Sequence, residues 1–401
     1  MEGCNITSSS SSSSSSSMAV CAAEYARKCR RVGEEVEEGD HLDFCGIPTD
    51  AAELCLARVP PSTLYSVCRS WRRFVYSPSC PPFSAVYALF LPLPPPPSLQ
   101  RQRRHLSPAP PLQFLSFDPI SSRWVPLPSP PPTAAGFLFH HPSFISRRLP
   151  VQSVAVSGKL LLIAATNLRF EPALTDPLVF DPVTKKWSRG PPFPAPRRWC
   201  AAGAVGGSVY LSSGMGSQYS TEVARSVEKW SVLDSPEWKA MGRLRDGKFS
   251  RDAIDAVGWR GKLFMVNVKG EAAKEGAIYD AESDSWGPMP EGMLGGWRGP
   301  AAAMEERTIY VVEETKGLLK QYDHVRDAWV EVLESPLLRG AEQMAAAGGK
   351  VCVVCGEGVA IAVVDTAARR VVAVVECPPE LQAVGIHILP RMTTGDAKLP
   401  K

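Results

Sequence analysis

The sequence predicts a mainly β protein, a six-bladed β-propeller preceded by a short α-helical module. Two recurring spacings predict the propeller. The first is an acidic residue that ends an apolar run and is followed six residues later by a tryptophan, which is typical of a strand, a tight turn and another strand. It occurs at Asp118, Asp181, Asp280 and Asp323, at Glu228 with four additional residues before Trp238, and at Asp365 with Val371 in the tryptophan position.

The second spacing lies upstream of each of these units, where a turn separates two more apolar runs. The turns are at 157–159, 206–208, 260–262, 306–308 and 348–350, and an arginine lies nine or ten residues before the middle residue of each turn. The residues between arginine and turn are small, as in Ala301-Ala302-Ala303. Each unit therefore has four strands, which makes one propeller blade. We expect the small first strands to line a crowded central channel and the tryptophans to fill the gaps between blades.

The blades extend over residues 84–390. Residues 86–91, 112–117 and 124–127 supply three strands of the first blade. The apolar run at 381–389 can supply the remaining strand and close the ring. This gives six blades, with residues 391–401 as a C-terminal tail.

Composition excludes several classes of protein. The chain has 401 residues with a net charge of +3, so no basic face for nucleic acid is predicted. The basic cluster at 101–105 lies in a proline-rich stretch and is expected to be a solvated loop. No run of 18 apolar residues is present, so no membrane span is expected. The 11 cysteines are irregularly spaced, which favours a reducing compartment, and Cys352 and Cys355 are interpreted as buried strand residues rather than a zinc site.

Residues 1–43 are predicted to be disordered. They contain ten consecutive serines at 8–17, then a basic patch and an acidic patch. A transit peptide is the alternative interpretation of this serine-rich, basic start.

Residues 44–80 form the helical module. Thr49 can cap a first helix, which Pro60 and Pro61 end. Ser62 can cap a second helix that ends at Ser77-Pro78, with one apolar stripe formed by Leu64, Val67, Cys68 and Trp71. So short a module needs a partner, either its own following domain or another protein.

The module resembles an F-box, most specifically in Val67-Cys68-Arg69-Ser70-Trp71-Arg72. The resemblance implies docking on the Skp-type adaptor of a cullin–RING ubiquitin ligase. The implied adaptor-binding residues are Ile47, Pro48, Leu54, Leu56, Val59, Pro60, Val67, Cys68 and Trp71. Thr49-Asp50-Ala51 and the short 60–62 segment depart from the usual pattern, which bears on adaptor affinity. A helical cap on the propeller is the alternative.

The blades resemble kelch repeats over residues 84–390, although the kelch double glycine is approached only at Ser213-Gly214 and Cys355-Gly356. Together with the module, they resemble plant F-box/kelch-repeat proteins. The stretch from Cys68 to Phe83 is most similar to the karrikin-up-regulated branch of that family, which implies a role in karrikin-type signalling.

No catalytic centre is predicted. The six histidines lack ligand spacing, and no phosphate loop, nucleophile elbow or dinucleotide fingerprint occurs. The chain is therefore interpreted as non-catalytic, with neither cofactor nor metal.

The candidate substrate-binding residues are the arginines ahead of the first strands and the tryptophans beside them: Arg197, Arg198, Trp199, Arg251, Trp297 and Arg298. Loops on a rigid scaffold commonly hold recognition residues, and tryptophan is a frequent anchor. The same arginines could instead hold blades together, and their regular spacing supports both roles.

Taken together, these features predict the substrate-recognition subunit of a Skp–cullin–F-box ubiquitin ligase. Its partners would be the Skp-type adaptor and an unidentified protein substrate, with neither nucleic acid nor membrane, in the nucleus, the cytoplasm or both. The alternatives are a kelch interaction scaffold outside the ligase and, less favoured, a metal-dependent kelch enzyme.

Overall fold

The computed structural model describes residues 49–77, 79–93, 112–131, 151–167, 169–251, 254–267 and 274–392, without the side chains of Thr49 and Arg251. The predicted N-terminal tail, 1–43, lies outside these residues, and so does the predicted C-terminal tail, 391–401, apart from Arg391 and Met392. The described chain separates into two compact units, a helical unit that ends at Phe83 and a β unit that spans Ser84–Met392.

The helical unit contains three short helices: α2 (Thr49–Leu56), α3 (Pro61–Val67) and α4 (Arg69–Tyr76). The expected single second helix is wrong, because Cys68 adopts an extended conformation (φ −156°, ψ 173°) that separates α3 from α4. Nor does Ser62 cap α3, since Pro60 occupies the N-cap position. The break lets both helices contribute to one small core made of Ala52, Leu56, Leu64, Phe74, Val75 and Cys80.

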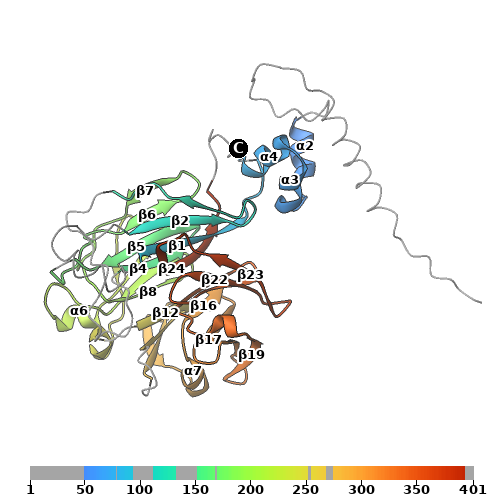
Figure 1. Ribbon diagram of the computed structural model, residues 1–401. Coiled ribbons are helices and arrows are strands. Elements are labelled where there is room, and N and C mark those ends of the chain that lie inside the picture. The colour runs from blue at the N-terminus through green and yellow to red at the C-terminus, as the bar shows by residue number, and fades with distance from the viewer. Residues whose placement is uncertain are drawn as a thin grey trace, which may run out of the picture. The chain divides into compact units, whose positions relative to one another are not determined.

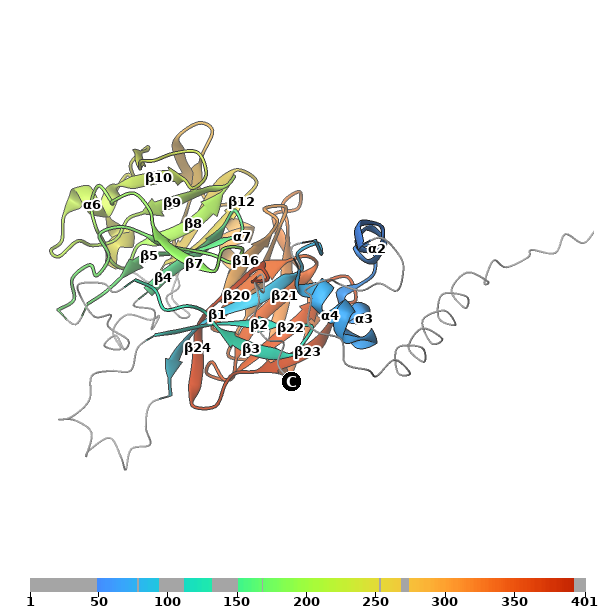
Figure 2. The same cartoon turned by 90° about the horizontal axis from the view of Figure 1, so that it is seen from above.

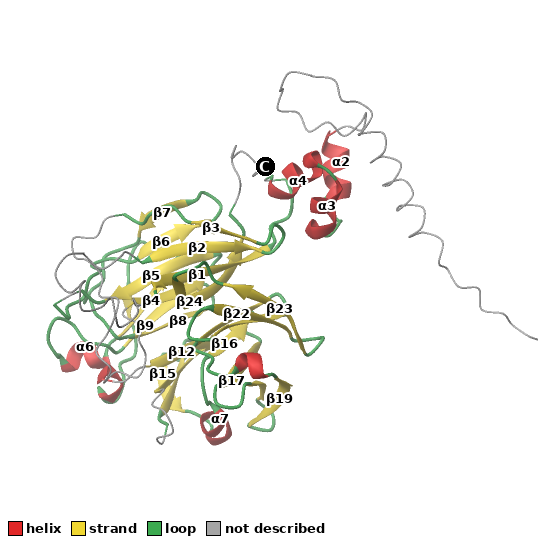
Figure 3. Cartoon of the chain, viewed as in Figure 1, coloured by secondary structure: helices red, strands yellow, loops and turns green. Residues whose placement is uncertain are grey.

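The β unit is a six-bladed propeller, and each blade is a four-stranded antiparallel sheet (Figures 1–3). In order from the innermost strand, the first three blades are β24 (Leu381–Pro390), β1 (Ser84–Pro92), β2 (Gln113–Asp118) and β3 (Arg123–Pro126); β4 (Val151–Val156), β5 (Lys159–Ala165), β6 (Leu178–Asp181) and β7 (Lys186–Arg189); and β8 (Ala201–Val205), β9 (Ser208–Ser212), β10 (Val227–Ser231) and β11 (Lys239–Ala240).

The next three blades follow the same order. They are β12 (Ile254–Trp259), β13 (Lys262–Asn267), β14 (Gly276–Asp280) and β15 (Ser285–Pro288); β16 (Ala301–Met304), β17 (Thr308–Glu313), β18 (Leu318–Asp323) and β19 (Ala328–Glu334); and β20 (Gln343–Ala347), β21 (Lys350–Cys355), β22 (Ala360–Asp365) and β23 (Arg370–Glu376). Short helices lie in the connections: α6 (Thr221–Arg225), η1 (Lys248–Arg251), α7 (Glu291–Gly296) and η2 (Pro336–Leu338).

The C-terminal strand closes the ring, as the sequence predicted. β24 supplies the innermost strand of the first blade and pairs antiparallel with β1 from Ser84↔Pro390 to Pro92↔Leu381 (Figure 1). The hydroxyl of the buried Tyr87 donates a 2.7 Å hydrogen bond to the carbonyl of Pro390. Strands from opposite ends of the sequence thus share one sheet.

The repeated tryptophans join each blade to the one before it. Each indole Nε1–H donates to a backbone carbonyl that lies at or beyond the outer strand of the preceding blade. The pairs are Trp124 to Glu376, Trp187 to Pro128, Trp238 to Pro191, Trp286 to Gly242 and Trp329 to Met293, at 2.7–3.0 Å. The rings also stack on an aromatic residue of their own blade, as Trp187 does on Phe180. Only the last blade, with Val371, lacks this connection among the six.

In five of the six blades, the aspartate of the repeat organises the turn between the third and fourth strands. Asp280, for example, accepts hydrogen bonds from the backbone N–H groups of Glu282 and Ser283 and forms an ion pair with Lys262. The predicted position of Glu228 at this turn of the third blade is wrong. Its Asp position is occupied by Ser231, which contacts Ser208 at 3.0 Å, and Glu228 lies three residues earlier for a different purpose.

Small residues let the innermost strands approach closely at the centre. A Cβ atom added to Gly258 on β12 would lie 1.7 Å from the carbonyl oxygen of Ala204 on β8. One added to Gly203 would lie 2.5 Å from a methyl of Leu263. The small-residue pattern of the first strands is therefore a steric requirement of the ring.

Candidate functional site

The helical unit presents apolar groups to solvent on α2 and on the turn that follows it. The side chain of Leu54 is 72% exposed, and Cys55 and Pro60 are exposed as well. So large an exposed leucine, on a unit with so small a core, is a candidate contact for a partner protein. Ile47 and Pro48 lie outside the described residues.

The other predicted adaptor-binding residues are less exposed to solvent than Leu54. Leu56 is only 7% exposed and belongs to the core of the unit, whereas Val59, Val67, Cys68 and Trp71 are half-buried. Arg72 ties α3 to α4: its Nε donates to the Tyr65 carbonyl at 2.6 Å, and its guanidinium lies 4.9 Å from the Tyr65 ring centre. The predicted set thus divides into surface groups and groups that hold the helices together.

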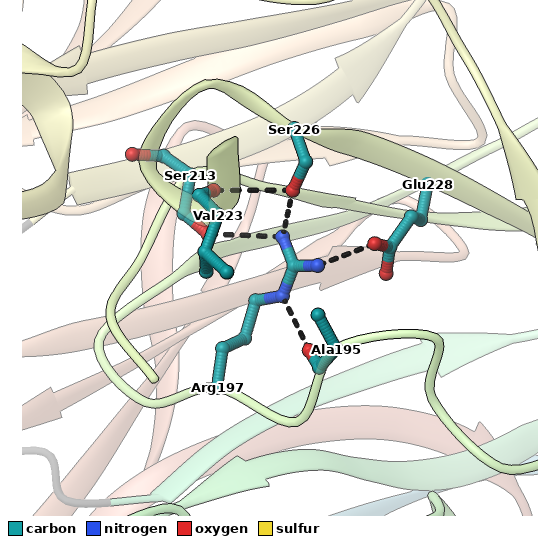
Figure 4. A network of polar contacts seen from close by, with 6 residues as sticks. All are labelled: Ala195, Arg197, Ser213, Val223, Ser226 and Glu228. Carbon is teal, nitrogen blue, oxygen red and sulfur yellow. Dashed lines mark hydrogen bonds and ion pairs between the residues drawn. The ribbon is translucent and has the colours of Figure 1, made fainter. Parts of the chain in front are cut away.

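At the propeller, Arg197 lies inside the third blade (Figure 4). Its guanidinium donates to the Glu228 carboxylate at 2.5 Å, to Ser226 Oγ at 2.6 Å and to the Ser213 carbonyl at 3.2 Å, and its Nε donates to the Ala195 carbonyl at 3.1 Å. Both charged side chains are buried. Burial raises the pKa of Glu228, and the charge of Arg197 opposes that rise. This geometry favours the structural alternative for Arg197.

The network was only partly visible in the sequence. The sequence predicts Arg197 as a site residue, but it places Glu228 at the turn position of the repeat. One signal in the sequence could have shown this. Four additional residues separate Glu228 from Trp238, which indicates that Glu228 is not the turn residue of its repeat.

Arg198 and Trp199 follow at the point where the chain enters β8. Arg198 is 6% exposed, donates from Nε to the Gly216 carbonyl at 3.4 Å, and stacks 3.8 Å from the Trp199 ring centre. Burial lowers the pKa of its guanidinium. Trp199 has a φ of +54°, which is uncommon for a residue with a side chain, and it lines the central channel.

The remaining predicted substrate-binding residues differ in their exposure to solvent. Trp297 is fully buried against Trp329, so it belongs to the core between blades. Its neighbour Arg298 is exposed. Arg251 ends η1, and its side chain is outside the described part of the chain. The predicted set therefore does not form one cluster, and Trp199 and Arg298 are its members with access to the channel or to solvent.

The central channel holds a cavity of about 420 Å³ lined by the innermost strands. Its polar lining includes Gln152, Trp199, Asp255 and His387. Because neighbouring strands are antiparallel, the loops that enter the first strands and those between second and third strands share one end of the propeller. Ser84, where the propeller begins, lies at the opposite end, since β1 runs antiparallel to the innermost strand β24.

His387 links the first two blades across the channel wall. Its Nε2 lies 2.8 Å from the hydroxyl of Ser153 on β4. Desolvation lowers the pKa of the imidazole to about 4, so the ring is neutral at physiological pH. A neutral imidazole that hydrogen-bonds to the neighbouring blade is consistent with a structural role in the closed propeller.

Within the part of the chain that the structure describes, no group of three or more His, Cys, Asp or Glu side chains is placed to hold a metal ion. The described helices also include none that is long and apolar enough to cross a membrane.

Comparison with known proteins gives a consistent picture. No protein-family model matches the sequence. The F-box/kelch-repeat protein SKIP25 of Arabidopsis thaliana is 46% identical over 390 residues, which cover 94% of this chain and 96% of that protein. The F-box protein AFR of the same plant is 24% identical and covers 70% and 71%. The F-box/kelch-repeat protein SKIP4 is 25% identical and covers 72% and 74%.

Proposed function

The chain belongs to the F-box/kelch-repeat proteins, and we propose that it is the substrate-recognition subunit of a Skp–cullin–F-box ubiquitin ligase. The observation that carries this proposal is the match over both parts of the chain, the helical unit and the closed propeller. In this role the helical unit binds the Skp-type adaptor and the propeller binds a protein substrate. The chain itself is not catalytic, and ubiquitin transfer belongs to other subunits.

The adaptor contact is proposed to centre on Leu54, with Cys55 and Pro60 beside it. Burial of an exposed leucine contributes about 1.5–3 kcal/mol, a large share for so small a unit. The half-buried Val59, Val67, Cys68 and Trp71 are further proposed contacts on the same unit, and Ile47 and Pro48 precede it in the sequence. Leu56 supports the surface through the core of the unit rather than by direct contact.

The substrate surface is proposed to be the propeller end that carries Trp199. It is the end of the propeller opposite to Ser84, where β1 begins. Trp199 and Arg298 are the proposed contact residues. Karrikin-type signalling is the proposed pathway, and the nucleus, the cytoplasm or both are the proposed locations.

A binding experiment with a purified Skp-type adaptor tests the ligase role. Leu54→Asp should abolish capture of the adaptor, because it places a charge at an exposed apolar contact without disturbing the core. Leu233→Asp is the matched control, since Leu233 is a 67% exposed leucine on the propeller, and it should leave capture unchanged.

If the wild-type chain captures no adaptor, the ligase role is wrong and an interaction scaffold remains. Leu56→Asp is not informative by itself, because a charge inside the core unfolds the helical unit. The full-length Leu54→Asp variant can also serve as a substrate trap. Proteins that accumulate on it relative to wild type in proximity labelling would be the candidate substrates.

A further inference from the structure

Two consecutive arginines ahead of β8 have opposite surroundings. The guanidinium of Arg197 is matched by the Glu228 carboxylate, a serine hydroxyl and two carbonyls. Arg198 is also buried, but its guanidinium makes one long hydrogen bond, from Nε to the Gly216 carbonyl at 3.4 Å. Its Nη1 is enclosed without a hydrogen-bond partner, and Arg198 forms no ion pair with a carboxylate in the described part of the chain.

A guanidinium in this position is unfavourable for the free propeller. A buried donor without an acceptor lowers stability, and a charged donor does so more strongly than a neutral one. Burial also lowers the pKa of Arg198, which is consistent with a charge that has lost water and gained no close partner. Native structures keep few such groups, and each one calls for an explanation.

The next residue has a second unfavourable feature. Trp199 has a left-handed backbone conformation, with a φ of +54°, and its ring centre lies 3.8 Å from the Arg198 guanidinium. The same residue lines the central channel at the end of the propeller proposed to bind substrate. Strained backbone is concentrated at sites where binding uses it. A strained tryptophan and an unmatched cation are thus neighbours at this end of the propeller.

The guanidinium of Arg198 is within reach of a ligand. Nη1 is enclosed, whereas Nη2 is neither enclosed nor hydrogen-bonded within the described chain, and the residue keeps 6% of its surface exposed. An anion that approaches from the Nη2 side therefore meets two N–H donors in one plane. Guanidinium groups bind the paired oxygens of carboxylates and phosphates in this way.

Glu171 decides between these two anions. Its charge acts on Arg198, although its Oε2 accepts a 3.1 Å hydrogen bond from Asn167 Nδ2 and it makes no ion pair with the arginine. A carboxylate already nearby repels a doubly charged phosphate more strongly than a singly charged carboxylate. The surroundings of Arg198 therefore favour a carboxylate as the ligand.

We propose that Arg198 binds a carboxylate of the protein substrate, with the Trp199 ring holding the guanidinium in place. The carboxylate is either an Asp or Glu side chain or the C-terminus of the substrate, because both present the same two oxygens. This proposal rests on the substrate-binding role proposed above for the propeller, and it adds the chemical class of the group that is bound.

The melting temperatures of two arginine variants separate recognition from a structural role. Arg198→Met removes a charge that has no close partner, so the melting temperature should equal that of the wild type or rise by about 2–4 °C. Arg197→Met is the matched control and should lower it, because Glu228 is then buried without its cation. If Arg198→Met melts below the wild type, the arginine is structural and the proposal is wrong.

Selection of synthetic random peptides on the full-length chain identifies the ligand chemistry. Half of the peptides carry an amidated C-terminus. The wild type should enrich peptides with Asp, Glu or a free C-terminus at one fixed position, and Arg198→Met should lose this enrichment. Arg326→Met is the control, since it removes a 79% exposed arginine from the turn between β18 and β19 and should select the same peptides as the wild type.

A selected peptide then distinguishes the two sources of the carboxylate. Either amidation of its C-terminus or exchange of its acidic residue for the amide should weaken binding to the wild type about tenfold or more. The same change should leave binding to Arg198→Met unaltered. A phosphoserine in place of the acidic residue should bind no more tightly than the carboxylate, and tighter binding would contradict the assignment.

Two outcomes of the selection would overturn the proposal: a wild type that enriches no carboxylate-bearing peptide, or an enrichment that Arg198→Met retains. The ligase role is tested separately. Arg198→Met should capture the Skp-type adaptor as the wild type does, so failure of the carboxylate site leaves the ligase role standing. A wild type that captures no adaptor but selects carboxylate-bearing peptides would reject the ligase role alone.

Discussion

The indole N–H of Trp187 donates a 2.7 Å hydrogen bond to the carbonyl oxygen of Pro128, so the second blade is fastened to the outer end of the first. Trp187 also stacks 5.2 Å from Phe180 of its own blade and 5.3 Å from Phe114 of the preceding one. One side chain thus joins two sheets by packing and by a directed bond. The hydrogen bond recurs at four further blade junctions.

We expect Trp187→Phe to lower the free energy of unfolding by about 1 kcal/mol, since it keeps an aromatic ring and loses the hydrogen bond. Trp187→Ala should cost about 3 kcal/mol because it also leaves a cavity between the blades. Urea denaturation of both variants measures the difference. Equal costs for the two would contradict a separate role for the hydrogen bond.

Gly258→Ala should destabilise the propeller by about 2 kcal/mol or more, because the new methyl would overlap the Ala204 carbonyl and force β8 and β12 apart. Gly287→Ala on β15 is the matched control, since nothing lies within 4 Å of its added methyl. Thermal melting of the two variants provides the measurement. A cost at Gly287 as large as that at Gly258 would show that steric contact at the channel is not the cause.

Removing one half of the buried pair in the third blade should be more harmful than removing both. Arg197→Ala leaves the Glu228 carboxylate buried without its cation and should cost about 3–5 kcal/mol. The double variant Arg197→Met/Glu228→Leu should cost less. Unfolding free energies of Arg197→Met, Glu228→Leu and the double variant complete the cycle, and strictly additive costs would argue against a coupled pair.

The turn carboxylate Asp280 should make the propeller sensitive to acid. Its hydrogen bonds with Lys262 and with the turn lower its pKa from 3.8 to about 2. A carboxyl with a depressed folded-state pKa contributes stability above pH 3.8, and that contribution is lost as the pH falls toward 2. Asp280→Asn should flatten the dependence of melting temperature on pH in this window. A profile parallel to that of the wild type would exclude Asp280 as a source.

Much of the fold could be predicted because the propeller repeats itself. The spacing from Asp280 to Trp286 is set by a strand, a tight turn and a strand, and the chain presents the same spacing again at Asp323 and Trp329. Repetition makes weak local signals add up. The closing strand 381–389 could be predicted because the first blade had only three strands of its own.

The third blade shows where the pattern fails. Glu228 looked like the turn acid because it precedes a tryptophan, but Ser231 occupies that position and Glu228 faces Arg197. Spacing along the chain does not reveal to which side of a sheet a residue points when additional residues are inserted. Likewise, the apolar stripe from Leu64 to Trp71 suggested one helix, whereas packing of two helices on one core places a break at Cys68.

The sequence by itself determined the architecture, the number of blades and the identity of the helical unit, because each depends on local patterns that recur or stand close together. Only the tertiary structure decided which candidate residues are available for binding. It buries Arg197, Trp297 and Leu56 and leaves Leu54 and Arg298 exposed. Burial is a sum over neighbours from distant parts of the chain, so it can be known only once those parts are in place.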